Sequence, residues 1–334
     1  MKRIALIGYG YWGTNLLRNL FESPYVEVAY CADLSSERLA LAKNRYPSLV
    51  TTTDFEKVIK DPKVDGVIIA TPTKTHFPLA KRAVSSGKDV LIEKPMTMSG
   101  REASDILLLG KKHKRIVMVD HTFLFNGSVL KIKDLINRGE LGDILYIDST
   151  RANLGLFQSD VNVVFDLAAH DFSIIQFLLG EKPKFLHATG KSHFNKQEDV
   201  AYITAHYLRD VIAHVHVSWL SPLKIRQMQI IGTKKMVVYD DVEPAEKVRI
   251  YDKGVVKEII SEKLKEQIKI GYRTGDVWLP KVDIVEPLGL LIKEFVEAIS
   301  ERREAKSGGE FAMGVMEVLE GATRAIRTGK KVRL

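Results

Sequence analysis

The sequence contains only one cysteine, Cys31, and no apolar segment near the length that spans a bilayer. A single cysteine excludes an internal disulfide, which is typical of proteins from a reducing compartment. Because Cys31 lies in the apolar run 28–32, we interpret it as a buried, unreactive thiol. A transmembrane helix needs about 20 consecutive apolar residues, so we do not expect this chain to enter a membrane.

The N-terminus also lacks the pattern of a secretion signal. Its apolar run, Ile4–Ile7, is too short for the hydrophobic core of a signal peptide, and a glycine-rich turn follows it at once. We therefore expect a cytoplasmic protein.

The sequence has no strong excess of one charge. It contains 50 Lys and Arg against 42 Asp and Glu, which gives a net charge of +8. Such an excess can attract nucleic acid or an anionic substrate, but most charges here are mixed in sign along the chain. The basic run 111–115 ends an expected helix, where cations interact favourably with the helix dipole. We expect no nucleic-acid partner, and attraction of a phosphorylated substrate stays open.

The first 120 residues alternate apolar, strand-like runs with amphipathic, helix-like stretches. This alternation indicates a parallel sheet covered by helices on both faces. At roughly 100–200 residues per domain, the length indicates two domains. We predict a doubly wound α/β domain over residues 1–121. Its strands are expected at Arg3–Ile7, Val26–Ala32, Val64–Thr71, Val90–Ile92 and Ile116–Val119.

The pattern changes after about residue 122, where longer alternating strands appear. The segment 211–219 places Val, Ala and Trp side chains on one face and His214 and His216 on the other, which indicates one buried face. We predict an α+β domain over residues 122–334 with a large, mostly antiparallel open sheet, whose second face could bind another subunit. The two closing helices could pack back on the first domain. Residues 240–285 are charged and fit no clear element.

The segment Gly8-Tyr9-Gly10-Tyr11-Trp12-Gly13 matches G-x-G-x-x-G between the first expected strand and helix. Gly8 permits a tight turn, Gly10 lets the backbone approach a pyrophosphate, and Gly13 lets helix and strand pack closely. The helix N-terminus attracts the anion. Asp33, at the end of the second strand, can accept both ribose hydroxyl groups of NAD. No basic residue directly follows Asp33, so we favour NAD over NADP, and a purely structural glycine turn is the alternative.

Two further segments follow strands, at the edge where open parallel sheets bind ligands. Thr71 and Pro72 are expected to line the nicotinamide side, and His76 starts the next helix as a capping or cofactor-contacting residue. Glu93-Lys94-Pro95 follows the next strand. There Lys94 could hydrogen-bond a substrate hydroxyl group and lower its pKa, and a surface lysine in a loop is the alternative.

Asp166 and His170 lie four residues apart in a helix that we predict over Asp166–Leu179. This spacing puts both side chains on one face, and a carboxylate beside an imidazole suits proton removal near neutral pH. Asp166 could instead cap the helix, and His170 could be a core residue. A metal would need a third ligand that no spacing supplies, so we predict no metal site. His121 is a candidate site residue because of its residue type alone, since no spacing or motif supports it.

The sequence resembles the Gfo/Idh/MocA family of sugar and cyclitol dehydrogenases in four features, namely Gly8–Gly13, Ala70-Thr71-Pro72 with His76, Glu93-Lys94-Pro95 and Asp166-x-x-x-His170. The resemblance covers essentially the whole chain and implies a Rossmann domain joined to an α/β domain with an open sheet, in dimers or tetramers. It implies that Lys94 orients substrate and nicotinamide, that His170 is the general acid/base, and that Asp166 positions the substrate or His170. The expected cofactor contacts are Gly8, Gly10, Tyr11, Trp12, Gly13, Asp33, Thr71, Pro72, His76, Glu93 and Lys94.

The segment from Arg151 to Asp171 resembles a branch of this family that acts on nucleotide sugars. In that branch the expected reaction is oxidation of a UDP-N-acetylhexosamine at C3, ahead of transamination. One departure is the segment 158–165, which lacks the glycine-rich stretch that many members carry. The substrate contacts that the resemblance implies are Asn126, Arg151, Asn153 and Asn162.

Three other hypotheses stay open for the sequence. A free sugar or a cyclitol such as inositol could be the substrate of the same site. A protein of this fold could bind NAD as a regulator without turnover, although a sensor has no chemical need for Lys94, Asp166 and His170 together. A glycosidase that uses NAD transiently is the third. We favour the NAD-dependent dehydrogenase.

Overall fold

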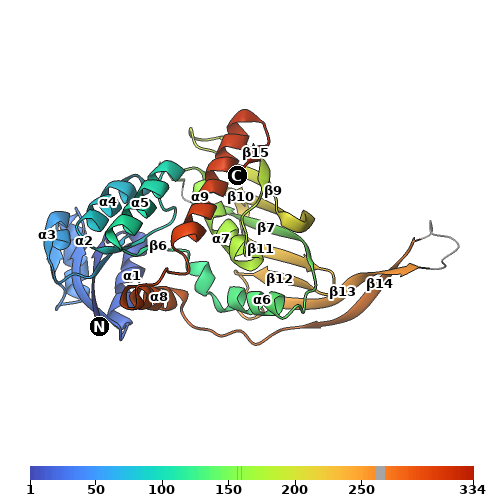
Figure 1. The fold of residues 1–334 in the computed structure, drawn as a ribbon, viewed down its shortest axis with the longest axis horizontal. Helices are drawn as coiled ribbons and strands as arrows, with labels where there is room; N and C mark the ends of the chain where they lie inside the picture. Colours follow the sequence, from blue (N-terminus) through green and yellow to red (C-terminus); the bar gives the residue numbers. More distant parts are fainter. Residues whose placement is uncertain (156, 159, 260–267) are drawn as a thin grey trace. The chain divides into compact units, whose positions relative to one another are not determined.

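The computed structural model spans residues 1–334 and describes all of them except 156, 159 and 260–267 (Figure 1). The chain forms two compact units, and each is assembled from separate stretches of sequence. The first unit contains residues 1–126, 158–173 and 285–320. The second unit contains residues 127–157, 174–284 and 321–334. Helical segments from near the C-terminus therefore belong to the first unit.

The first unit is built on a six-stranded parallel sheet in the order β3-β2-β1-β4-β5-β6. This is the predicted doubly wound topology, with its switch point between β1 and β4. All residues of the central strands β4 and β5 are buried, as expected of parallel strands covered on both faces. The strands are β1 (Lys2–Ile7), β2 (Val26–Ala32), β3 (Thr51–Thr52), β4 (Gly66–Ile69), β5 (Asp89–Ile92) and β6 (Val117–Val119).

Several helices of this unit begin at side chains that cap them. Ser35 accepts a hydrogen bond from the backbone N–H of Arg38 at the start of α2 (3.2 Å), and Ser99 accepts one from Glu102 at the start of α5 (3.3 Å). Such caps satisfy N–H groups that a helix leaves unpaired. The helices are α1 (Tyr11–Glu22), α2 (Ser36–Arg45), α3 (Phe55–Lys60), α4 (His76–Ser85) and α5 (Gly100–His113).

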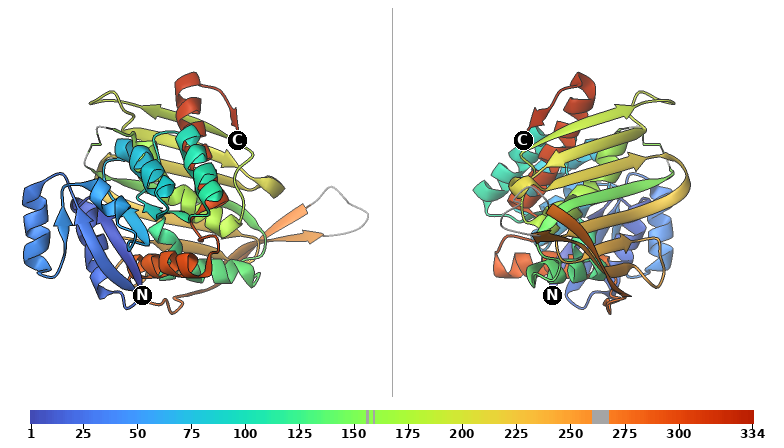
Figure 2. Two further views of the ribbon diagram at one scale, coloured as in Figure 1. Left: turned by 60° about the vertical axis from the view of Figure 1, so that its left-hand side comes forward. Right: turned by 90° about the vertical axis from the view of Figure 1, so that its right-hand side faces the viewer.

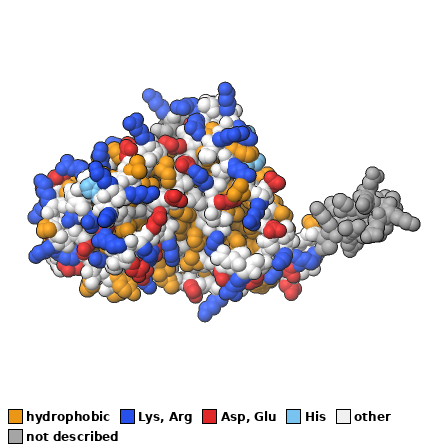
Figure 3. All heavy atoms as spheres, in the orientation of Figure 1, with side chains coloured by type: hydrophobic (Ala, Val, Ile, Leu, Met, Phe, Trp, Pro, Cys, Tyr) orange, Lys and Arg blue, Asp and Glu red, His pale blue; other side chains and the backbone are white. Residues whose placement is uncertain are grey.

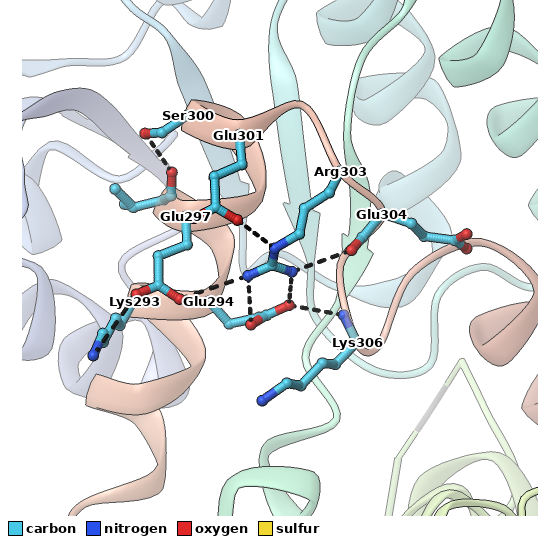
Figure 4. A network of polar contacts seen from close by, with 9 residues as sticks. Lys293, Glu294, Glu297, Ser300, Glu301, Arg303, Glu304 and Lys306 are labelled. Atoms are coloured by element: carbon cyan, nitrogen blue, oxygen red, sulfur yellow. Dashed lines mark hydrogen bonds and ion pairs between the residues drawn. The ribbon is translucent and has the colours of Figure 1, made fainter.

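Helix α8 (Pro287–Glu301) and the larger part of α9 (Gly309–Thr328) also belong to the first unit. The connection between them runs along β6, the edge strand. The backbone N–H of Val119 donates to the carbonyl oxygen of Ser307 (3.0 Å), and the Ser307 hydroxyl group donates to the carbonyl oxygen of Val119 (2.7 Å). Arg303 fixes the same connection by an ion pair with Glu294 at 2.6 Å (Figure 4).

The second unit is built on a nine-stranded sheet (Figure 2). Strands β7 and β10 are parallel, and the other neighbouring strands are antiparallel, which confirms the predicted mostly antiparallel sheet. The order is β14-β13-β12-β11-β7-β10-β9-β8-β15. The strands are β7 (Ile144–Leu154), β8 (Phe185–Lys191), β9 (Val200–His206), β10 (Ile212–Ser218), β11 (Leu220–Gly232), β12 (Met236–Asp240), β13 (Val248–Ile259), β14 (Ile268–Trp278) and β15 (Val332–Arg333), with helices α6 (Gly127–Asn137) and α7 (Ala169–Leu179).

Strand β10 shows how the faces of this sheet differ. Ala213, Val215 and Val217 are fully buried, whereas the alternate residues His214 and His216 are half-buried. This is the pattern that the sequence predicted for a strand with one buried face. On the more open face, the ring of Tyr202 in β9 stacks on the ring of His216, with 4.4 Å between their centroids.

Residues 240–285, for which the sequence predicted no clear element, contain the long strands β13 and β14. These strands pair as an antiparallel ribbon that extends beyond the other strands of the sheet (Figures 1 and 2). The cross-strand partners Val255 and Tyr272 are both exposed. An alternation of apolar and polar residues marks strands with one buried face, so a ribbon in contact with solvent carries little of that signal.

Within the described part of the chain, no helix is long and apolar enough to cross a membrane. The charged residues are mixed in sign on the face that Figure 3 draws, where Lys and Arg side chains lie among Asp and Glu. That mixture agrees with the interpretation that the charged residues of both signs form a solvated surface.

Candidate active site

Several polar or glycine residues of the first unit follow the carboxyl ends of its parallel strands. The glycine loop follows β1, Thr71 follows β4, Lys94 follows β5, and Asp120 follows β6. In an open parallel sheet these ends meet at one edge, and ligands bind there beside the switch point. The fold therefore gathers at this edge residues that lie far apart in the sequence.

The glycine loop is shaped for a dinucleotide. Gly8 has a φ of +100°, and a Cβ there would overlap the carbonyl oxygen of Ala70. A Cβ on Gly13 would overlap the carbonyl oxygen of Gly8, so both glycines are required by close backbone approach. A Cβ on Gly10 would meet no atom within 4 Å, and Gly10 caps α1 without a side-chain hydrogen bond. The open space at Gly10 and the uncapped N-terminus of α1 fit the pyrophosphate of NAD.

Asp33 ties the glycine loop to the end of β2. Its carboxylate accepts hydrogen bonds from the backbone N–H of Tyr9 (2.7 Å) and of Ser35 (2.8 Å). Each carboxylate oxygen can still accept a second hydrogen bond, so these contacts are compatible with binding the ribose hydroxyl groups. Arg38 lies close by, with Nη1 3.8 Å from Oδ2 of Asp33. Arg38 was not predicted to lie here, because it follows Asp33 by five positions rather than directly.

His76 is buried and connects the loops that follow β4 and β5. Its Nε2 lies 2.8 Å from the carbonyl oxygen of Thr71, and its Nδ1 lies 3.0 Å from the carbonyl oxygen of Pro95. Burial lowers the pKa of His76, which favours the neutral ring. A neutral imidazole has one N–H group and can donate to only one of these carbonyls at a time. The Lys94–Pro95 peptide bond, next to this contact, is cis.

Lys94 contacts Asp166. The ammonium group donates to the carboxylate Oδ1 and to the backbone carbonyl oxygen of Asp166, each at 2.9 Å. Both side chains are less than one-fifth exposed, so this pair is shielded from much of the solvent. The resemblance implied that Asp166 positions the substrate or His170, and its carboxylate also holds the ammonium group of Lys94.

Asp166 lies in a π-helical turn, Val164–Ala168, that precedes α7, where the sequence predicted a continuous α-helix from Asp166. Asn162 begins this turn: its side-chain oxygen accepts from the N–H of Phe165 and its carbonyl oxygen from the N–H of Asp166, both at 3.0 Å. Such turns are rare and occur frequently at functional sites. Asn162, expected as a substrate contact, also helps to hold Asp166 in this turn.

His170 lies in the first turn of α7, four residues after Asp166. Its ring packs edge-on against Phe123, with 5.1 Å between the centroids. Phe123 belongs to a short 3₁₀ turn, Thr122–Phe125, that ends at Asn126. The first unit therefore contains Lys94, Asp166, His170 and Asn126, while Arg151 and Asn153 lie on β7 of the second unit.

A buried acidic pair stands beside these residues. Burial raises the pKa of Glu93 well above its usual range, and the neighbouring Asp120 raises it further. Asp120 accepts hydrogen bonds from Nε1 of Trp12 (3.3 Å) and from the hydroxyl group of Thr122. It thereby links the glycine loop to the end of β6. Asp120 was not predicted as a site residue, although it follows a strand as Thr71 and Lys94 do.

His121, next to Asp120, is buried and packs edge-on against Phe311 of α9, with 5.8 Å between centroids. Burial lowers the pKa of His121 to about 4, so the ring is neutral at physiological pH. This environment is that of a core histidine. In the described ranges, no group of three or more His, Cys, Asp or Glu side chains could hold a metal ion.

Comparison with known proteins agrees with this geometry. Residues 2–121 match the model of an oxidoreductase family with an NAD-binding Rossmann fold, and residues 129–238 match the Gfo/Idh/MocA C-terminal domain. The oxidoreductase YrbE from Bacillus subtilis (strain 168) is 24% identical over 252 residues, 72% of this chain and 74% of its own. Inositol 2-dehydrogenase from Rhizobium meliloti (strain 1021) is 22% identical over an alignment that covers 99% of each chain.

Among solved structures, the fold is similar to UDP-N-acetylglucosamine 3-dehydrogenase GnnA from Acidithiobacillus ferrooxidans. The TM-score is 0.81 with 20% identity, and the match covers 97% of each chain. At this identity the likeness shows the fold, while the two domain matches show the family. The chain belongs to the Gfo/Idh/MocA family of NAD-dependent sugar or cyclitol dehydrogenases, the family that its motifs predicted.

Proposed function

We propose that this oxidoreductase oxidises a secondary hydroxyl group of a sugar, and that the group is the C3 hydroxyl of a UDP-N-acetylhexosamine. The observation that carries the proposal is the ion pair between Lys94 and Asp166 at the carboxyl end of β5. It places an ammonium group at the edge where the glycine loop binds the dinucleotide. Lys94 thus stands where a hydroxyl group next to the nicotinamide would need a hydrogen-bond donor.

Each residue of the motif has a distinct task in this reaction. His170 takes the proton from the reacting hydroxyl group, and Lys94 hydrogen-bonds the same oxygen, where negative charge develops. Asp166 holds Lys94 in place through its two 2.9 Å contacts. NAD, when bound, supplies the nicotinamide ring that accepts the hydride from the carbinol carbon. The substrate therefore loses one proton to His170 and one hydride, and a ketone forms.

The nucleotide-sugar assignment is supported by the segment from Arg151 to Asp171, by which the sequence resembles that branch of the family. Arg151 is buried on β7, and guanidinium groups suit the diphosphate of a UDP-sugar. We propose Asn126, Arg151, Asn153 and Asn162 as substrate contacts. Asn162 also stabilises the turn that carries Asp166.

A second candidate substrate is a free cyclitol. It is favoured by the alignment with inositol 2-dehydrogenase, which covers almost the whole of both chains. The same Lys94, Asp166 and His170 would act on a ring hydroxyl group of inositol. The two candidates differ in the anionic group of the substrate, so a substrate panel separates them.

The test is absorbance at the reduced-nicotinamide band with purified protein and NAD. The panel holds UDP-N-acetylglucosamine, its uronic acid, free glucose and myo-inositol, each with and without 2-oxoglutarate as a possible reoxidant. A rise with a UDP-sugar, absent in Lys94→Met and His170→Asn and kept in the surface variant Lys112→Met, supports the proposal. A rise with myo-inositol alone contradicts the nucleotide-sugar assignment, and no rise or reoxidation with any compound contradicts both candidates.

We also propose that the chain forms a homodimer or homotetramer through the more open face of the nine-stranded sheet. The stacked rings of Tyr202 and His216 give this face an aromatic surface that is suited to burial against a second copy. Light scattering on a size-exclusion column measures the assembly. The variant Tyr202→Lys is expected to lower its mass to that of one chain, and an unchanged mass would place the interface elsewhere.

A further inference from the structure

We propose a second ligand site in the first unit, a pocket that binds a phosphate monoester of about the size of a mononucleotide. The pocket has a volume of about 570 Å³ and lies between the end of α5, the start of β6 and the connection from α8 to α9. Pockets of roughly 300–1,000 Å³ hold small organic ligands, so this volume suits a mononucleotide rather than a simple ion.

The pocket is separate from the dinucleotide site. Its lining includes Ile116 and Val117, which lie at the amino end of β6, whereas Asp120 follows the carboxyl end of the same strand. All strands of this sheet are parallel. The pocket therefore lies at the amino ends of the strands, and the glycine loop lies at their carboxyl ends. A ligand in the pocket therefore leaves the NAD site unobstructed.

The walls of the pocket are apolar and its charged groups are mainly cations. Leu107, Ile116, Val117 and Ala305 supply apolar surface for the body of a ligand. Five basic side chains also line it, against the single carboxylate of Glu304. They are Lys111, Lys114, Arg115, Arg302 and Arg303.

Two of these cations are neutralised by carboxylates of the protein. Arg302 binds the buried Asp89 at 3.0 Å, and Arg303 binds Glu294 at 2.6 Å and Glu301 at 2.7 Å (Figure 4). These pairs fix the wall that the α8–α9 connection forms. An external anion would therefore be attracted mainly by the other three cations of the pocket.

Lys111, Lys114 and Arg115 form a cationic group at the end of α5. Among the described residues, none of the three forms an ion pair with a carboxylate within 4.0 Å. The Nε atom of Arg115 is buried and has no hydrogen-bond partner in the described part of the chain. A buried N–H group without a partner is costly, and a phosphate oxygen would satisfy it. Two lysines and an arginine supply three positive charges, which are enough to neutralise the two negative charges of a phosphate dianion.

Glu304 does not cancel this cationic group. Figure 4 shows its carboxylate pointing away from Arg303, which contacts only the carbonyl oxygen of Glu304, at 3.2 Å. The carboxylate lies instead against Gly309, the first residue of α9, where a Cβ would overlap it. There the positive end of the helix dipole stabilises it. Glu304 is thus matched by the N-terminus of α9. The cations at the carboxyl end of α5 are stabilised by the dipole of that helix, and Glu304 forms no ion pair with them among the described residues.

The experiment is calorimetric titration of the full chain with AMP, with NAD at saturation so that the adenosine part of the cofactor site is filled. Three exposed lysines at the end of the same helix give matched variants, each changing the charge by one. Lys111→Gln and Lys114→Gln remove cations that line the pocket, and Lys112→Gln removes one that does not. Inorganic phosphate is titrated as a second probe, and melting temperatures verify that each variant folds.

We expect saturable binding of AMP that Lys111→Gln and Lys114→Gln each weaken by about tenfold, as loss of one charge-assisted hydrogen bond predicts. Lys112→Gln should leave the affinity unchanged, and inorganic phosphate should bind more weakly than AMP. No binding at millimolar AMP, or equal losses in all three variants, would overturn the site. Phosphate binding as tight as AMP would overturn the assignment of a ligand with an apolar body.

Discussion

Lys94 donates hydrogen bonds to both the side chain and the backbone carbonyl oxygen of Asp166, across 72 positions of sequence. Lys94 follows β5 of the parallel sheet, and Asp166 lies in the π-helical turn before α7. Two acceptors on one residue fix the ammonium group more firmly than a single carboxylate would. The position of the reacting groups therefore depends on the turn as well as on the sheet.

The first prediction concerns this pair. Lys94→Met should lower kcat by about 10²–10⁴-fold, because it removes both the hydrogen bond to the hydroxyl oxygen and the nearby positive charge. Asp166→Asn keeps an oxygen acceptor and should lower kcat less than Lys94→Met. The measurements are steady-state kinetics and the NAD dissociation constant from fluorescence titration. A dissociation constant for NAD that rises in parallel with the loss of kcat would contradict a role centred on the substrate.

The second prediction separates the tasks of two glycines in the cofactor loop. Gly10→Val should weaken NAD binding by at least about tenfold and leave the melting temperature unchanged, since its side chain enters only the space expected for pyrophosphate. Gly13→Ala should destabilise the fold by about 1–3 kcal/mol, because its Cβ overlaps the carbonyl oxygen of Gly8. Calorimetry of unfolding and NAD titration measure both effects. A Gly10→Val variant that binds NAD normally would show that the pyrophosphate passes elsewhere.

The third prediction concerns the choice between NAD and NADP. Asp33→Asn removes the charge that repels a 2′-phosphate group, and it leaves Arg38 nearby to attract one. The affinity ratio of NADP to NAD should therefore rise by about tenfold or more. The double variant Asp33→Asn with Arg38→Gln should lose most of that rise. If the ratio rises equally with and without Arg38, the arginine takes no part in selectivity.

The fold of the first unit was predictable because its sequence has strong local signals. The apolar runs, the glycine loop and the position of Lys94 after a strand follow from periodicity and from the rule for ligand edges of parallel sheets. The contact of Trp12 with Asp120 joins residues 108 positions apart, so no local pattern in the sequence indicates it. Arg38 was missed for a related reason, because the first turn of α2 carries its side chain back toward Asp33.

The π-helical turn and the ribbon β13–β14 were not predictable for different physical reasons. A π-helical turn differs from an α-helix by its hydrogen-bond spacing, and the apolar residues around Asp166 fit either form. The hydrogen bond by which the Asn162 side chain starts the turn was likewise not indicated by the sequence. In the ribbon, the apolar side chains of Val255 and Tyr272 are exposed, so the alternation on which strand prediction depends is weakened there.

The last prediction concerns the pH dependence of stability through His121. Burial lowers the pKa of His121 from 6.5 to about 4 in the folded chain, against smaller opposing effects of Asp120. The unfolded chain therefore binds more protons than the folded chain between pH 6.5 and pH 4, and stability falls as the pH falls through this window. A pKa shift of this size corresponds to a change of about 3 kcal/mol in the free energy of unfolding.

His121→Phe is the variant that isolates this contribution, because it keeps an aromatic ring against Phe311 and removes the titrating group. The difference in unfolding free energy between variant and wild type should grow in favour of the variant as the pH falls from 6.5 to 4. Glu93, with a raised pKa, contributes a slope of the opposite sign in both proteins, so the comparison largely removes it. Urea unfolding at several pH values measures the difference. A constant difference across the window would mean that His121 takes up its proton without unfolding, and that its environment is more hydrated than its burial indicates.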